Sequence, residues 1–200
     1  MTAGREIVTH LSIVARFLKL DATAAEELGN TPAAARRSFV TLWWRFPYYV
    51  IIGYFSNLPN FARYDFPAGP FILVRCTLFF FALALTLSAV HIICQWEGLQ
   101  DKFHRWVVGF NWGRVLLEML LLPFSLAPAF VPVSRDAQVT NMVVAYFFMI
   151  WFMWAMSWRT LKCNPFLAAG IAITPFLVEG LAADYLNTRM YGVARPFFDP

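Results

Sequence analysis

The chain has 200 residues, of which 60% are hydrophobic and only 14% are charged, and its formal net charge is +4. A soluble domain of this length needs far more polar surface, so the composition excludes that class and predicts a polytopic membrane protein. The small, dispersed positive excess also excludes a nucleic-acid partner. No cleavable signal peptide is expected, because the first strongly apolar run begins only near Phe39.

The N-terminal region, residues 1–36, predicts an amphipathic helix at the membrane interface. Its apolar residues recur at helical spacing, at Ile7, Leu11, Val14 and Leu18. Its basic residues fall elsewhere on the helical wheel, at Arg5, Arg16 and Lys19. Such a helix can lie on the inner leaflet with its basic side chains toward anionic headgroups, or it can pack on the ends of a helix bundle. The sequence leaves both interpretations open.

Five apolar segments reach the length of about 20 residues that a membrane-spanning helix needs. They lie at about 38–58, 71–96, 106–131, 137–158 and 165–183. The expected fold class is therefore an all-α bundle of five transmembrane helices over residues 37–185, followed by a short outer tail at 186–200. Prolines and glycines between positions 56 and 70 predict a loop after the first span.

The distribution of basic residues predicts which side each terminus occupies. With five spans, nine lysines and arginines lie on the side of the N-terminus and five lie on the opposite side. Because basic residues are more frequent in cytoplasmic loops, we expect the N-terminus inside and the C-terminus outside. The expected location is a bacterial inner (cytoplasmic) membrane.

Charged residues within the predicted spans are the candidates for a functional site. Each costs about 2.5–3.5 kcal/mol at a helix centre, so each requires a reason. Arg114 and Glu118 are four residues apart and share a helix face, and Arg45 enters the first span to a similar depth. We predict that these three form a polar cluster between the first and third spans. The cluster can bind an ion, a proton or an anionic headgroup, or it can be an ion pair that fixes how the two spans pack. The ion pair is the favoured interpretation, because the carboxylate is already neutralised by its neighbouring cation.

Two further charges and two prolines accompany this cluster. Arg75 and Glu179 lie near the outer edge of the second and fifth spans. They can pair across these spans, or Arg75 can extend alone to the interface. Pro47 and Pro123 are expected to break the first and third helices.

Metal, cofactor and catalytic motifs are not found in the sequence. His91 and Cys94 share a face of the second span and are weak metal candidates, without HExxH or CxxC spacing to support them. No metal site, no catalytic residue and no cofactor beyond bound lipid is expected, although the aromatic faces also suit a quinone or a carotenoid. Small residues that force close helix packing are scarce, with Ala82/Ala89 and Gly170/Thr174 as weak examples.

Three short motifs carry a resemblance to known proteins. Within residues 15–48 these are Leu20-Asp21, Arg37-Ser38-Phe39 and Pro47-Tyr48. The stretch resembles uncharacterised small bacterial inner-membrane proteins, which are similar in plan to the Yip family. This resemblance implies five spans, an inside N-terminus and a membrane-organising role.

The sequence therefore favours a non-enzymatic accessory or organising subunit that contacts membrane lipids and other integral membrane proteins. One alternative is a small transporter or channel that uses the intramembrane Glu118. Another is a subunit of an electron-transfer complex that uses His91.

Overall fold

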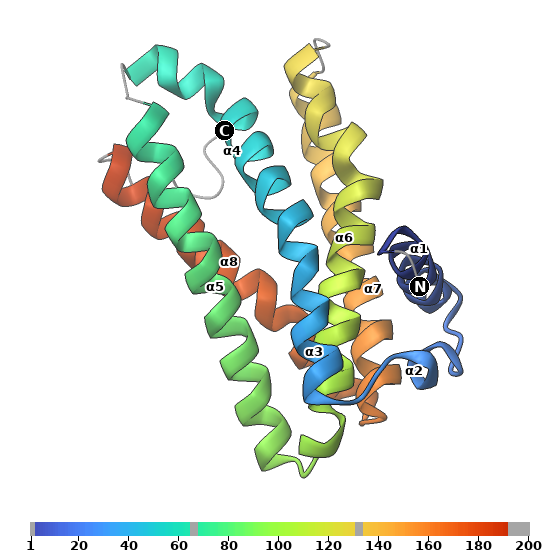
Figure 1. The fold of residues 1–200 in the computed structure, drawn as a ribbon. Helices are drawn as coiled ribbons and strands as arrows, with labels where there is room; N and C mark the ends of the chain where they lie inside the picture. The colour runs from blue at the N-terminus through green and yellow to red at the C-terminus, as the bar shows by residue number, and fades with distance from the viewer. Residues whose placement is uncertain (1–2, 65–67, 131–133, 192–200) are drawn as a thin grey trace.

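The computed structural model describes residues 3–64, 68–130 and 134–191, and they form helices without any strand. The predicted all-α class is thus confirmed. Figure 1 shows the long helices beside a group of short N-terminal ones. The elements are α1 (Ala3–Ala15), η1 (Arg16–Lys19), α2 (Ala24–Glu27), α3 (Pro32–Ser38), η2 (Phe39–Thr41), α4 (Leu42–Tyr64), α5 (Ala68–Trp96), α6 (Gln100–Phe130), α7 (Arg135–Leu161) and α8 (Pro165–Tyr191).

Four of these helices are long and apolar enough to cross a membrane. The qualifying segments are Gly69–Trp96, Gln100–Leu126, Asp136–Leu161 and Pro165–Ala182. They correspond to the second through fifth predicted spans and are compatible with a multi-pass membrane protein. Helix α4 is not among them; the side chains of its residues 56–64 lie outside the described part, and its first turns contain Trp43, Trp44, Arg45 and Pro47. The count of five spans stays a prediction.

Helix boundaries correct three expectations. The loop predicted from position 56 is wrong, because α4 continues as a helix to Tyr64. Pro47 and Pro123 do not break their helices, since α4 and α6 continue through them. Each proline lacks only one N–H donor, and the rest of the helical hydrogen bonds can hold the backbone in place. The expected tail is helical up to Tyr191, and positions 192–200 lie outside the described residues.

Residues 3–38 form a unit that we call the N-terminal cap. Helix α1 and helix α3 both pack against α6, and η1 packs against α7. Ile13, Val14 and Phe17 are buried in these contacts, whereas Ile7 and Val8 are exposed. These contacts support the interpretation that the N-terminal helix packs on the bundle. Contact of α1 with a lipid leaflet stays a prediction.

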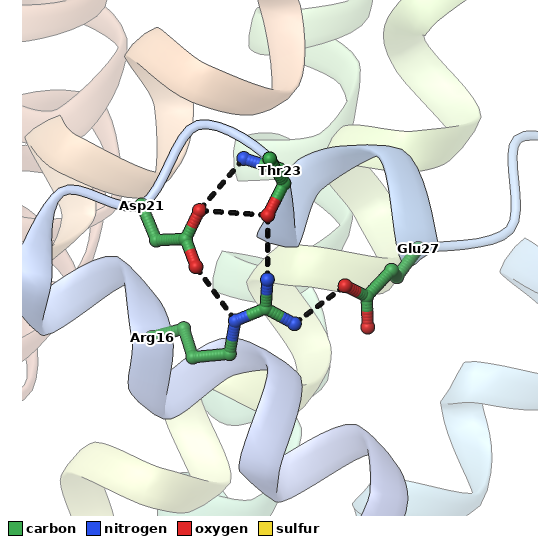
Figure 2. Close-up of polar contacts among 4 residues, drawn as sticks. All are labelled: Arg16, Asp21, Thr23 and Glu27. Carbon is green, nitrogen blue, oxygen red and sulfur yellow. Dashed lines mark hydrogen bonds and ion pairs between the residues drawn. The ribbon is translucent and has the colours of Figure 1, made fainter.

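Arg16 holds the turn between η1 and α2 in place (Figure 2). Its guanidinium donates to Asp21 Oδ2 at 2.7 Å, to Thr23 Oγ1 at 2.6 Å and to Glu27 Oε1 at 2.5 Å. The second carboxylate oxygen of Asp21 accepts the backbone N–H of Thr23 at 2.8 Å. One arginine therefore satisfies three acceptors and fixes the fold of a segment with little regular structure.

The cap continues directly into the long helices. The hydroxyl of Thr31 accepts the backbone N–H of Ala34 at 3.1 Å, and Pro32 occupies the first helical position. This is a favourable start for a helix, because the proline lacks an N–H that would have no partner there. From Pro32 the chain stays helical through α3, η2 and α4, so the cap and α4 share one helical rod.

Two glycines allow the central helix α6 to approach α7 closely. A Cβ at Gly113 would lie 2.8 Å from Cε1 of Phe152, and a Cβ at Gly109 would lie 3.0 Å from Sδ of Met156. These two positions form a GxxxG motif, in which small residues let helix backbones come together. This motif is not among the small-residue pairs named from the sequence, and Gly170, which belongs to one of those pairs, has open space around it.

Candidate functional site

A chain of ion pairs connects α4, α6 and α8 inside the bundle. Arg45 Nε donates to Glu118 Oε1 at 3.1 Å, and Arg114 Nε lies 3.6 Å from the same oxygen. Arg114 also donates through Nη2 to Glu179 Oε1 at 2.8 Å. We call these four residues the ion-pair network. The structure thus brings together the three residues that the sequence had grouped, and it adds Glu179.

The positions of these side chains follow from their helices. Arg114 and Glu118 are one turn apart on α6, and Arg45 reaches them from the first turn of α4. The guanidinium carbon of Arg45 lies 5.6 Å from the ring centre of Phe79 and 5.5 Å from that of Phe110. These distances suit cation–π contacts, which favour a charged arginine in this apolar setting.

Burial varies along the network. The side chain of Arg45 is 2% exposed, that of Glu118 is 10% exposed and that of Arg114 is 12% exposed. Glu179 is 35% exposed and forms the accessible end of the chain of contacts. Glu118 is therefore the carboxylate whose loss would leave the buried Arg45 without an ion-pair partner.

The network has no net charge, because it pairs two arginines with two carboxylates. From Arg45, Arg114 and Glu118 alone, the sequence predicted an excess positive charge. Buried ions of opposite sign compensate part of the desolvation cost of each other, so a balanced set can persist without an external ligand. The geometry thus favours a structural link between helices.

Three polar atoms of the network are nevertheless buried without a hydrogen-bond partner among the described residues. They are Arg45 Nη1, Arg114 Nε and Glu118 Oε2. Unsatisfied buried polar groups are costly, so these atoms have the capacity to take up a water molecule, an ion or, at the carboxylate, a proton.

The suggested pairing of Arg75 with Glu179 is corrected by the structure. The ion pair of Glu179 is with Arg114, since α8 presents this carboxylate toward α6. The guanidinium carbon of Arg75 lies 4.5 Å from the ring centre of Tyr49, and its side chain passes directly over Gly53, where a Cβ would overlap with it. Arg75 therefore contributes to the packing of α4 against α5.

The two weak metal candidates do not converge on a common site. His91 is exposed, and its Nε2 lies 3.0 Å from Nε2 of Gln95. Cys94 is fully buried in the hydrophobic core. Within residues 3–64, 68–130 and 134–191, no group of three or more His, Cys, Asp or Glu side chains is placed to hold a metal ion.

No protein-family model, no curated protein and no solved structure matches this chain. The class that its fold defines is an all-helical protein whose helices are compatible with several membrane crossings. Its distinguishing feature is the buried, charge-balanced ion-pair network.

Proposed function

We propose that the protein is a non-enzymatic accessory or organising subunit integral to a bacterial inner membrane. In this proposal the ion-pair network holds α4, α6 and α8 in one arrangement. The observation that carries it is the internal charge balance of the network, because Arg45 and Arg114 already have Glu118 and Glu179 as counterions. A site dedicated to a charged substrate would be expected to present an uncompensated charge.

The outward surfaces of the helices support contact with lipid and with other integral membrane proteins. In α6, 61% of the most apolar window is buried within the protein, compared with 22% in α5, α7 and α8. The long helices around α6 therefore present most of their apolar side chains outward. Prominent exposed residues on α7 are Val139, Met142, Val143, Val144, Tyr146 and Phe147. A lipid bilayer or the helices of a partner protein would cover such a surface.

Helix lengths support a placement in which the cap lies at the inner membrane surface. The apolar segment of α5 has 28 residues and so extends for about 42 Å, longer than the hydrocarbon core of about 30 Å. The exposed charges of the cap, such as Arg37, require water or headgroups, so the cap lies outside the hydrocarbon.

The orientation in this proposal follows the distribution of basic residues. An inside N-terminus and an outside C-terminus require α4 to cross the membrane as a fifth span. With 23 residues, α4 is about 34 Å long, which is sufficient for one crossing. The resemblance to the plan of the Yip family is consistent with this orientation and stays a prediction.

A small transporter or channel is the second candidate function. The observation in its favour is that Glu118 Oε2 is buried without a hydrogen-bond partner among the described residues. A carboxylate in this state can take up and release a proton during transport. The third possibility, an electron-transfer subunit, would be excluded in its haem form by an optical spectrum of purified protein without a Soret band.

Replacing Glu118 with glutamine distinguishes the first two functions. If the network is structural, Glu118→Gln should lower the thermal unfolding temperature. Proton flux into proteoliposomes should then equal that of empty liposomes for both the wild type and the variant. A transporter predicts wild-type flux above that background, which the variant loses while it remains folded. The exposed Asp184 supplies a matched control, because Asp184→Asn removes a carboxylate outside the network.

The role as a subunit has its own test. Gentle purification from the native membrane, followed by mass spectrometry, should recover another integral membrane protein together with this chain. Recovery of a monomer that carries no other protein would contradict the proposal.

A further inference from the structure

A pocket of about 180 Å³ lies between the cap and α6. Helix α1 contributes Glu6 and His10 to its lining, α3 contributes Arg37 and Ser38, and α6 contributes Trp112. Figure 1 shows α1 and α3 beside α6, at the level where the cap covers the bundle. Sites for drug-sized ligands measure about 300–1,000 Å³, so this pocket suits a small chemical group.

The base of the pocket is rigid. The rings of His10 and Trp112 stack with their centres 5.0 Å apart and their planes 14° apart. His10 Nδ1 lies 2.9 Å from the carbonyl oxygen of Glu6, to which it donates. The hydroxyl of Ser38 donates to Ala35 O at 2.7 Å and accepts from Asn111 Nδ2 at 2.8 Å. These contacts fix the lining before any ligand arrives, which lowers the cost of binding.

The remaining polar groups of the lining carry opposite charges. Glu6 supplies an exposed carboxylate from α1, and Arg37 supplies an exposed guanidinium from α3. The ion pairs of the described residues do not include a pair between these two side chains. A ligand that joins an anionic group to a primary amine would match both charges at once. Arginine binds phosphate through two parallel N–H donors, and a carboxylate accepts hydrogen bonds from an ammonium group.

The surface next to the pocket is apolar on the membrane side. Val40 and Trp44 follow Arg37 at i+3 and i+7 on the same helical rod, so the three residues share a face. Val40 is 53% exposed and Trp44 is 52% exposed. The polar pocket could hold a phospholipid headgroup, and the apolar residues one and two helical turns below it could contact the acyl chains.

We propose that this pocket binds the headgroup of phosphatidylethanolamine, with the phosphate at Arg37 and the ammonium group at Glu6. The acyl chains then run along Val40 and Trp44. This inference rests on the membrane placement given under the proposed function and adds a specific lipid to it. A bound lipid at this position would connect α1 to α4 and stabilise the cap on the bundle.

Native mass spectrometry tests the proposal. The full-length protein is reconstituted in nanodiscs of equal parts phosphatidylethanolamine, phosphatidylcholine and phosphatidylglycerol, and the lipid that remains on the released protein is identified. We expect retention of one phosphatidylethanolamine in preference to the other two lipids. Phosphatidylcholine lacks the N–H donors that Glu6 requires, and phosphatidylglycerol lacks the amine. Equal retention of all three lipids would overturn the proposal.

Substitutions in the pocket provide a second test. Arg37→Gln and Glu6→Gln should each reduce retained phosphatidylethanolamine about ten-fold, the effect of one lost charge-assisted hydrogen bond. Arg37→Lys should restore part of the retention. The matched controls are Arg36→Gln on the same helix and Glu97→Gln at an exposed carboxylate, and both should retain lipid as the wild type does. Retention that is unchanged in the pocket variants, or equally reduced in the controls, would contradict the assignment.

A competition experiment distinguishes the lipid from a soluble ligand of the same chemistry. Soluble phosphoethanolamine, added at the concentration of the lipid, should not displace the phospholipid, because it lacks the acyl chains. Displacement at equal concentration would identify a soluble ligand and overturn the lipid proposal. The Glu118→Gln stability measurement does not depend on this pocket, so the two proposals can fail separately.

Discussion

Arg114 of α6 donates a hydrogen bond to Glu179 of α8 at 2.8 Å, although 65 residues separate them in the chain. The same arginine lies 3.6 Å from Glu118, its neighbour one turn along α6. Arg114 therefore joins a contact within one helix to a contact between two helices. With Glu179 included, two arginines pair with two carboxylates, so the network has no net charge.

The two carboxylates of the network should differ in their contribution to stability. Glu118→Gln removes the common partner of two buried arginines, and we expect a loss of about 3–5 kcal/mol in the free energy of unfolding. Glu179 is 35% exposed and, among the described residues, pairs only with Arg114, which keeps Glu118 as a partner, so Glu179→Gln should cost less, about 1 kcal/mol. Thermal or chemical denaturation in detergent measures both, with Asp184→Asn as the control. An equal loss at the two sites would contradict this ranking.

Close packing of α6 on α7 predicts a strong effect of a single methyl group. In Gly113→Ala the added Cβ would lie 2.8 Å from the Phe152 ring, and overpacking of this kind costs about 1–3 kcal/mol. Gly170→Ala is the matched control, because nothing lies within 4 Å of a Cβ at that position. Alanine favours helix formation, so this control should be neutral or stabilising by up to about 1 kcal/mol. Comparable unfolding temperatures for the two variants would rule out the GxxxG contact.

The contacts of Asp21 with Arg16 predict a loss of stability in acid. The hydrogen bond from the Arg16 side chain is the largest cause that lowers the pKa of Asp21, from 3.8 to about 2. A carboxylate with a lowered pKa stabilises the folded state above its unfolded pKa of about 4, and this contribution disappears as the pH falls toward 2. The unfolding temperature of the wild type should therefore fall more between pH 6 and pH 3 than that of Asp21→Asn. The same fall in both proteins would show that the contact does not stabilise the cap.

The number of spans determines where the two ends of the chain lie. Single cysteines placed at Arg5 and at Asp184, in a background without Cys76, Cys94 and Cys163, report on this question. If α4 crosses the membrane, a membrane-impermeant thiol reagent added to intact cells should label Asp184→Cys but not Arg5→Cys. Labelling of both sites or of neither would indicate four spans, with α4 not crossing.

Several features could be read from the sequence because they depend on local composition. The apolar runs of α5 to α8 predict their helices, since about 20 apolar residues suit a membrane helix in almost any tertiary context. The spacing of Arg114 and Glu118 likewise predicts a shared face without knowledge of neighbouring helices. The motif from Gly109 to Gly113 was also visible in the sequence, but only its contacts with Met156 and Phe152 show which helix it faces.

The sequence by itself determined the class of this protein and the position of its buried charges along each helix, because hydropathy and the helical period are local properties. Only the tertiary structure decided which charges meet. The sequence leaves open whether Glu179 pairs with Arg75, whereas the packing of α8 brings Glu179 to Arg114. The pocket between Glu6 and Arg37 exists because the cap folds back against α6. Neither contact follows from the local sequence, since each depends on how distant helices pack together.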